Sequence, residues 1–254
     1  MEVLALIFLG LLQGLTEFLP ISSSGHLVLF GNLFHVEETL FVSIVLHCAT
    51  LLSVIVVLRK EIWFMLRHPF SQESINLMLA TIPTCVIALT LLPFASQAFN
   101  GKFLGVSFLI SAFLLFIAER KKSKEPFASK QIAAKEALFM GLAQGLAIFP
   151  GVSRSGTTIS AGLYMGADKK KCAKFSFLMS LPIIVLSLFM EVYQISTAEQ
   201  TIAVSCLGLA LAFLVAFIAG TLSIKLMIKL TSNSNLKYFS AYLVLIAIAS
   251  FVIL

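Results

Sequence analysis

The chain has 254 residues, of which 59% are hydrophobic and only 12% charged, and its mean hydropathy is +1.01. Soluble domains average roughly 25% charged residues, so this composition excludes an ordinary soluble protein and predicts an integral membrane protein. The net charge of +6 lies mostly in short loops between apolar segments, as topology signals do. We therefore expect no nucleic-acid partner.

The chain begins with two short apolar segments, residues 1–19 and 26–34, which are separated by Pro20 and a run of serines. The second segment is too short to cross a hydrocarbon core of ~30 Å at ~1.5 Å per helical residue. Together the two segments predict a re-entrant hairpin whose turn lies at membrane depth. Non-helical backbone at that depth needs protein or water around it, so we expect the serine loop to line a cavity.

The remaining apolar segments predict two similar halves. The predicted spans of the first half are residues 39–58, 75–95 and 103–118. A second broken segment, 137–165, is followed by spans at 175–195, 201–224 and 238–254. We expect an all-α, polytopic membrane protein with about six transmembrane helices and two re-entrant hairpins. It would form one integral domain, residues 1–254, with a first repeat at 1–118, a basic cytoplasmic connector at 119–136 and a second repeat at 137–254.

Two stretches of the chain resemble each other. Residues 141–156 align without a gap with residues 10–25, and nine of the sixteen positions are identical. The match predicts an internal repeat. The copies differ at ionisable positions, because Ile148 stands in place of Glu17 and Arg154 in place of Ser23. One copy therefore carries an acid and the other a base.

The basic residues predict the orientation of the spans. Sixteen of the eighteen Lys and Arg residues lie in loops on one side of the predicted topology. The opposite loops carry Glu2, Glu37, Glu38 and Glu199, with Lys102 as their one basic residue. By the positive-inside rule both termini face outward. The two hairpins then enter from opposite sides, so the repeat is inverted and its broken segments meet near the bilayer midplane.

The meeting hairpins would gather polar side chains inside an apolar bundle. A charged side chain in hydrocarbon costs at least ~2.5–3.5 kcal/mol, so Glu17 and His26 there indicate a functional site. Arg154 offers a planar fork of donors that suits phosphate. Hydroxyls and glycine backbone N–H groups supply further donors. The set suits an oxyanion, and the apolar surroundings suit a lipid phosphate or diphosphate.

Residues 13–26 and 150–158 resemble the two signature motifs of the undecaprenyl-pyrophosphate phosphatases of the bacitracin-resistance type. The resemblance in length and hydropathy covers essentially the whole chain. It implies an inverted-repeat membrane fold in the bacterial cell (inner) membrane. It also implies hydrolysis of undecaprenyl diphosphate to undecaprenyl phosphate and inorganic phosphate, which recycles the lipid carrier of peptidoglycan synthesis.

The resemblance also assigns roles to residues. The expected catalytic residues are Glu17, Ser23, His26 and Arg154. The expected substrate-binding residues are Gln13, Ser24, Gly25, Ser153, Ser155, Gly156 and Thr158. Ser23 is the favoured nucleophile, activated by His26 or Glu17, while His26 as nucleophile or as leaving-group acid stays open. A divalent cation, Mg²⁺ or Ca²⁺, would be bound by Glu17, although Gln13 weakens a site with two carboxylates.

Other interpretations remain. A lipid-phosphate carrier or flippase would share the inverted repeat and the anion-binding arginine, whereas the clustered Glu17, Ser23 and His26 favour hydrolysis. Serines in apolar segments, such as Ser155, often bond only to helix carbonyls. His47 is interpreted as a buried structural histidine. The expected partners are the polyprenyl diphosphate lipid, the bilayer and a second copy of the chain in a homodimer.

Overall fold

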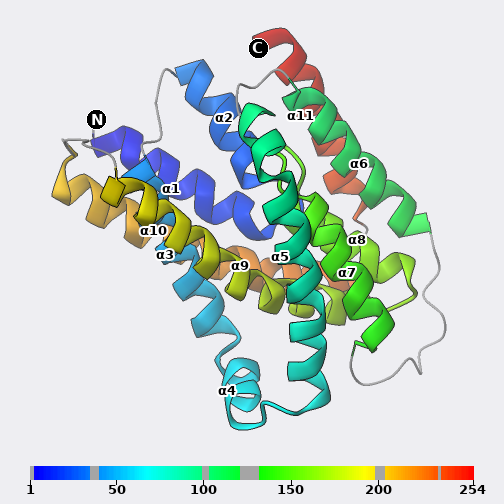
Figure 1. Cartoon of the computed structure of the whole chain (residues 1–254). Coiled ribbons are helices and arrows are strands. Elements are labelled where there is room, and N and C mark those ends of the chain that lie inside the picture. The colour runs from blue at the N-terminus through cyan, green and yellow to red at the C-terminus, as the bar shows by residue number, and fades with distance from the viewer. Residues whose placement is uncertain (1–2, 35–39, 99–102, 121–131, 198–203, 234–235) are drawn as a thin grey trace.

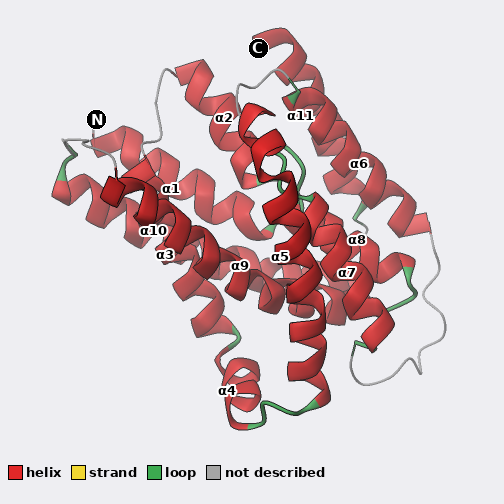
Figure 2. Cartoon of the chain, in the orientation of Figure 1, coloured by secondary structure: helices red, strands yellow, loops and turns green. Residues whose placement is uncertain are grey.

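A computed structural model describes residues 3–34, 40–98, 103–120, 132–197, 204–233 and 236–254. Within these ranges the chain forms eleven α-helices and no strand (Figure 2), which confirms the all-α fold class. The helices are α1 (Val3–Phe18), α2 (Ser23–Phe34), α3 (Leu40–Val57), α4 (Arg59–Arg67), α5 (Gln72–Ala98), α6 (Leu104–Arg120), α7 (Ala134–Leu146), α8 (Arg154–Tyr164), α9 (Lys169–Thr197), α10 (Cys206–Asn233) and α11 (Lys237–Ile253). The outer-loop charges Glu2, Glu37, Glu38, Lys102 and Glu199, and most of connector 119–136, lie outside the described residues.

The predicted apolar segments all form helices, and the two broken segments are helical hairpins, α1–α2 and α7–α8. Local backbone geometry accounts for both breaks. Pro20 and Pro150 lack the N–H that a continuing helix requires. Ser22 has φ 71° and Gly151 has φ 86°, a left-handed conformation that a right-handed helix does not contain.

One helix was not predicted. The segment after residue 58, which the sequence placed in a basic loop, forms α4 and is bent by 78° from α3. The apolar and basic residues of this segment have helical spacing. Because the segment directly follows a predicted span, the sequence analysis interpreted its basic residues as a cytoplasmic loop. Figure 1 shows α4 beyond the end of α3, at the bottom of the view.

Among the described residues, three helical stretches are long and apolar enough to cross a membrane by length and composition: Gln72–Phe94, Lys169–Thr197 and Cys206–Thr231. Counted together, the bent pair α3 and α4 would add a fourth span, and α3, with 18 residues, is the part of it that crosses. α6 and α11 have 17 residues each in the described part of the chain. Large apolar side chains such as Phe113, Phe189 and Leu222 are exposed on helices, as contact with lipid requires. The chain is a multi-pass membrane protein, and the count of six spans stays a prediction.

Helices of one half of the chain pack against helices of the other half. α1 packs along α10, while α7 packs along α5, and α6 lies beside α11 (Figure 1). Glycines allow this close approach. A Cβ at Gly14 would lie 2.5 Å from the carbonyl oxygen of Ala216, and one at Gly145 would lie 2.7 Å from Cβ of Ile87. The first helix of each hairpin is therefore supported by a long helix of the other half. This exchange supports the inverted repeat, which stays a prediction.

Candidate active site

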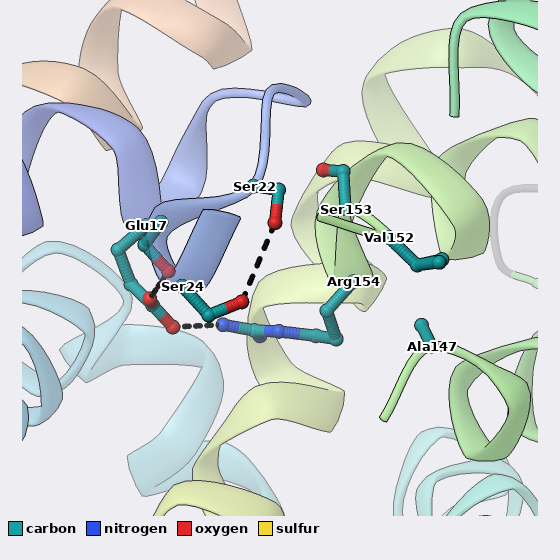
Figure 3. A pocket seen from close by; sticks show the side chains of 8 residues that line it. Glu17, Ser22, Ser24, Ala147, Val152, Ser153 and Arg154 are labelled. Carbon is teal, nitrogen blue, oxygen red and sulfur yellow. Dashed lines mark hydrogen bonds and ion pairs between the residues drawn. The ribbon is translucent and has the colours of Figure 1, made fainter. Parts of the chain in front are cut away.

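The loops of the two hairpins face each other and enclose a small cavity (Figure 3). Its volume is ≈ 60 Å³, which leaves room for a few water molecules. The cavity is lined by Glu17, Ser22, Ser23, Ser24, Ala147, Val152, Ser153 and Arg154. Because both hairpins contribute to this lining, the cavity exists only where the two halves of the chain meet.

Glu17 and Arg154 form an ion pair across the cavity. Nη2 of Arg154 donates to Oε1 of Glu17, and Figure 3 shows the guanidinium pointing at the carboxylate. The side chain of Arg154 is 17% exposed and that of Glu17 is 8% exposed, so water screens the pair only weakly. Nη1 of Arg154 is buried and has no hydrogen-bond partner among the described residues. An unpaired buried donor costs ~1–3 kcal/mol, so this atom favours a bound acceptor such as a phosphate oxygen.

The second oxygen of Glu17 accepts from Ser23. Ser23 Oγ donates to Oε2 over 2.5 Å, and Nε2 of Gln13 donates to the same oxygen over 3.1 Å. A hydroxyl–carboxylate bond of this length is typical of a charge-assisted contact. Glu17 also adjoins Phe18, which is fully buried against the ring of Phe177, so packing fixes the end of α1. The carboxylate is thus held where it can accept the proton of the Ser23 hydroxyl.

Each loop leads into a helix whose first turn is capped by a serine. Ser153 Oγ accepts from the backbone N–H of Gly156 over 3.0 Å, and Ser22 Oγ accepts from that of Gly25 over 3.3 Å. Ser155 Oγ donates to the carbonyl oxygen of Leu19, which joins the start of α8 to the other hairpin. The N-termini of α2 and α8, with their positive dipole ends, therefore both begin at the cavity.

His26 is held between the backbone of the first loop and α11. Its side chain is 1% exposed, and it is not among the residues that line the cavity. Nδ1 lies 2.7 Å from the carbonyl oxygen of Ser22, and Nε2 lies 2.8 Å from the hydroxyl of Tyr242. Since a carbonyl only accepts, Nδ1 carries a proton and donates to Ser22, while Nε2 shares a hydrogen bond with the hydroxyl of Tyr242. Both ring nitrogens are therefore engaged by groups other than Ser23.

Comparison with known proteins identifies the family. A family model described as "Bacitracin resistance protein BacA" matches residues 6–249. The chain belongs to the BacA family. An undecaprenyl-diphosphatase of Thermosipho africanus is 39% identical over 252 residues, covering 96% of this chain and 98% of the relative. That of Carboxydothermus hydrogenoformans is 35% identical over 250 residues (97% and 95%), and undecaprenyl-diphosphatase 3 of Bacillus cereus is 39% identical over 247 residues (95% and 93%). The family predicted from the two motifs is confirmed.

Several residues that the BacA motifs single out serve packing in this structure. Thr158 Oγ1 lies 2.6 Å from Oγ of Ser176, so its hydroxyl faces α9. A Cβ at Gly25 would lie 2.7 Å from the ring of Phe108, and one at Gly156 would lie 3.0 Å from Cβ of Ser153. These glycines allow the loops to approach their neighbours closely.

Sequence reasoning missed two residues that support the loops of this BacA-family protein. Tyr242 on α11 binds His26 of the first hairpin. Ser111 on α6 accepts from the backbone N–H of Ser153 over 2.9 Å and donates to the carbonyl oxygen of Gly151 over 3.2 Å. Both residues lie outside the two motifs, so the sequence patterns used to find the site gave no signal for them.

A second polar cluster links α3 and α9. His47 Nδ1 lies 3.6 Å from Oε1 of Glu191, and Ser43 Oγ donates to that oxygen over 3.3 Å. The sequence interpretation treated His47 as an isolated structural histidine, and it did not connect it to Glu191. The two residues are far apart in the chain, and no motif links them.

The cavity of this BacA-family protein meets only part of the needs of a divalent cation. In the described part of the chain, no group of three or more His, Cys, Asp or Glu residues is placed to hold a metal. Glu17 is the one carboxylate in the cavity lining, and both its oxygens already accept hydrogen bonds. Mg²⁺ and Ca²⁺ prefer several oxygen ligands. These residues therefore fit a cation only where substrate phosphate oxygens complete its coordination.

Proposed function

We propose that this protein is an undecaprenyl-diphosphatase, which hydrolyses undecaprenyl diphosphate to undecaprenyl phosphate and inorganic phosphate. The observation that carries the proposal is the meeting of Glu17, Ser23 and Arg154 in one cavity between the hairpins. The activity named for its full-length relatives supports it. The product would return to peptidoglycan synthesis as lipid carrier.

The proposed reaction begins with Ser23. Its Oγ attacks the terminal phosphorus, its proton passes to Glu17, and the bond from that phosphorus to the bridging oxygen breaks, releasing undecaprenyl phosphate. Water then cleaves the phosphoserine, which frees phosphate and restores the hydroxyl. Arg154 and the N-termini of α2 and α8 would stabilise the charge that develops on the phosphoryl oxygens.

The hydrogen-bond pattern favours Glu17 over His26 as the group that activates Ser23. Ser23 Oγ already donates to Glu17, whereas both nitrogens of His26 have other partners. His26 as nucleophile or leaving-group acid stays open, and it would require the contact with Tyr242 to break. In the favoured version His26 and Tyr242 hold the first loop in shape.

Three further features belong to the proposal. Mg²⁺ or Ca²⁺, bound by Glu17 together with the diphosphate, would neutralise charge on the phosphoryl oxygens. The protein would lie in the bacterial cell (inner) membrane with both termini outside, as the basic loops predict. A homodimer is proposed as its assembly, testable by cross-linking in native membranes.

Phosphate release by the detergent-purified protein from a polyprenyl diphosphate tests this function. We expect release by the wild type and a loss of at least about 100-fold in Arg154→Ala, as for removal of a strong transition-state donor. Arg120→Ala is the matched control, because Arg120 lies at the end of α6 over the ring of Phe116. A loss under about threefold in Arg154→Ala contradicts the role of this residue. Folded wild type that binds the lipid without releasing phosphate would favour a carrier or flippase.

A further inference from the structure

The short helix α4 has no part in the candidate active site. It follows α3 after a bend of 78°. A helix that turns by this angle at the end of a membrane-crossing helix runs close to the membrane plane. Figure 1 shows α4 beyond the end of α3 and beside the lower end of α5.

The two faces of α4 have different surroundings. Ile62 and Met65 are partly buried and pack against the main apolar core. Trp63 and Leu66 point away from that core and are 58% and 69% exposed, and Phe70 just beyond the helix is 89% exposed. Trp63 and Leu66 lie three residues apart, so they form one apolar stripe along the helix, and Phe70 adds an exposed ring where the chain leaves the helix. The described part of the chain provides no cover for this stripe.

The exposed side of α4 is also basic. Arg59, Lys60 and Arg67 are exposed, and the guanidinium of Arg67 lies 4.7 Å from the centroid of the Trp63 ring. Glu61, the acidic residue of the helix, is paired with Lys174 Nζ at 2.7 Å. The uncompensated charge on α4 is therefore positive. Aromatic and aliphatic side chains beside cations are typical of helices that lie in a membrane interface.

We propose that α4 is an in-plane anchor that binds anionic phospholipids of the leaflet on the basic side of the protein. Trp63 and Leu66 lie at the depth of the carbonyl ends of the acyl chains, while Arg59, Lys60 and Arg67 contact lipid phosphates. Charge complementarity selects this partner, because that leaflet surrounds the end of α3 and carries negative headgroups. The positive-inside rule assigns this side to the cytoplasm.

The chain itself provides the probe, since Trp63 is its one tryptophan. Full-length protein is reconstituted in vesicles, and quenching of Trp63 fluorescence is compared for phosphatidylcholine brominated near the carbonyl end or near the methyl end of its chains. Phosphatidylglycerol brominated near the carbonyl end tests lipid preference. We expect stronger quenching from the shallow than from the deep position, and stronger quenching from phosphatidylglycerol than from phosphatidylcholine by about twofold.

Charge variants separate lipid recognition from simple insertion. In Arg59→Gln/Lys60→Gln we expect the phosphatidylglycerol preference to fall, because only Arg67 is left to contact lipid phosphates, while the depth profile persists because Arg67 still contacts Trp63. Lys225→Gln/Lys229→Gln on α10 is the matched control and should keep the preference. Absence of quenching, strongest quenching from the deep position, or a preference unchanged by Arg59→Gln/Lys60→Gln would each overturn the proposal. The measurement does not depend on phosphatase activity.

Discussion

The imidazole of His26 and the phenol of Tyr242 lie nearly parallel inside the protein, with 7° between their planes and 2.8 Å between Nε2 and the hydroxyl oxygen. The two residues are far apart in the chain and belong to α2 and α11. Through the bond from His26 Nδ1 to the carbonyl oxygen of Ser22, Tyr242 is connected to the loop that carries Ser23. A residue outside both motifs therefore supports the geometry of the first loop.

Tyr242→Phe removes one hydroxyl and leaves Nε2 of His26 without this hydrogen-bond partner. A buried group left unpaired costs ~1–3 kcal/mol. We expect kcat for phosphate release to fall by about tenfold with little change in KM, because the loop that presents Ser23 loses its fixed position. Tyr238→Phe, whose side chain is 77% exposed, serves as control. Equal activity of both variants and the wild type would contradict a positioning role for Tyr242.

Ser23 and its neighbour Ser24 provide a matched pair for the nucleophile. Both line the cavity, but the hydroxyl of Ser23 bonds to Glu17 at 2.5 Å, whereas the hydroxyl of Ser24 lies 3.4 Å from that of Ser22. We expect Ser23→Ala to lose at least about 100-fold in kcat and Ser24→Ala less than about tenfold. Steady-state phosphate release measures the whole reaction. Labelled phosphate trapped on the acid-quenched protein measures the formation of phosphoserine. Near-full turnover in Ser23→Ala would leave His26 as the nucleophile.

Removal of divalent cations by a chelator tests whether the reaction needs Mg²⁺ or Ca²⁺. Because Glu17 alone offers few ligands, we expect no detectable binding of Mg²⁺ or Ca²⁺ to the protein by calorimetry when no diphosphate is present. With substrate, we expect excess EDTA to reduce phosphate release by at least about tenfold and added Mg²⁺ or Ca²⁺ to restore it. Full activity in EDTA would rule out the cation. Tight cation binding by the free protein would instead point to ligands beyond Glu17.

Gly14 tests the close packing of α1 on α10. Gly14→Ala places a methyl group 2.5 Å from the carbonyl oxygen of Ala216 and 2.8 Å from Cβ of Ala219, so backbone must shift. Overpacking of this kind costs ~1–3 kcal/mol. We expect a lower thermal midpoint in detergent than for Leu15→Ala, a change at a neighbouring exposed position. If both variants unfold at the wild-type temperature, the helices are not packed this closely.

Glu61 and Lys174 join α4 to the start of α9. Burial raises the pKa of Glu61, but the hydrogen bond to Lys174, a backbone hydrogen bond and the charges of Lys174 and Lys60 together outweigh it, so this pKa lies below its ordinary 4.5. A lowered folded-state pKa means that the pair stabilises the fold above pH ~4.5 and that this contribution disappears as the pH falls through the lowered value. The pair is partly exposed, so the contribution is at most ~1 kcal/mol.

The matching measurement is the thermal midpoint of wild type and Glu61→Gln across pH. We expect the wild type to be slightly more stable at pH ~7 and the two midpoints to converge below pH ~4. Glu73→Gln, on the first turn of α5, is the control. If the difference between the two thermal midpoints grew as the pH falls, the sign would be opposite to that expected for this ion pair.

Much of the fold was predictable because hydrophobicity follows lipid contact closely. The apolar segments, both hairpins and the residues that place Glu17 beside Arg154 came from composition, spacing and the repeat. α4 was missed because a basic amphipathic helix just after a span resembles a topology loop. Its exposed Trp63 and Leu66 make sense only once the bend after α3 is known.

The site was predictable as a set of residues but not as a set of contacts. Motif position placed His26 among the catalytic residues and Thr158 among the substrate-binding residues. In the structure the His26 ring contacts Tyr242, and the Thr158 hydroxyl contacts Ser176. Which way a side chain points depends on helices that are distant in sequence. Local pattern does not contain that information, and neither did it connect His47 with Glu191.

The exchanged pairing of helices also sets an order of assembly. α1 precedes its partner α10, which begins at Cys206, by most of the described chain, so α1 is synthesised well before the helix that it packs along. α7, by contrast, finds α5 already made. The helix that carries Glu17 is therefore made early, and the helix that packs along it is made late. The ion pair of Glu17 with Arg154 then joins the two halves of the chain at the site.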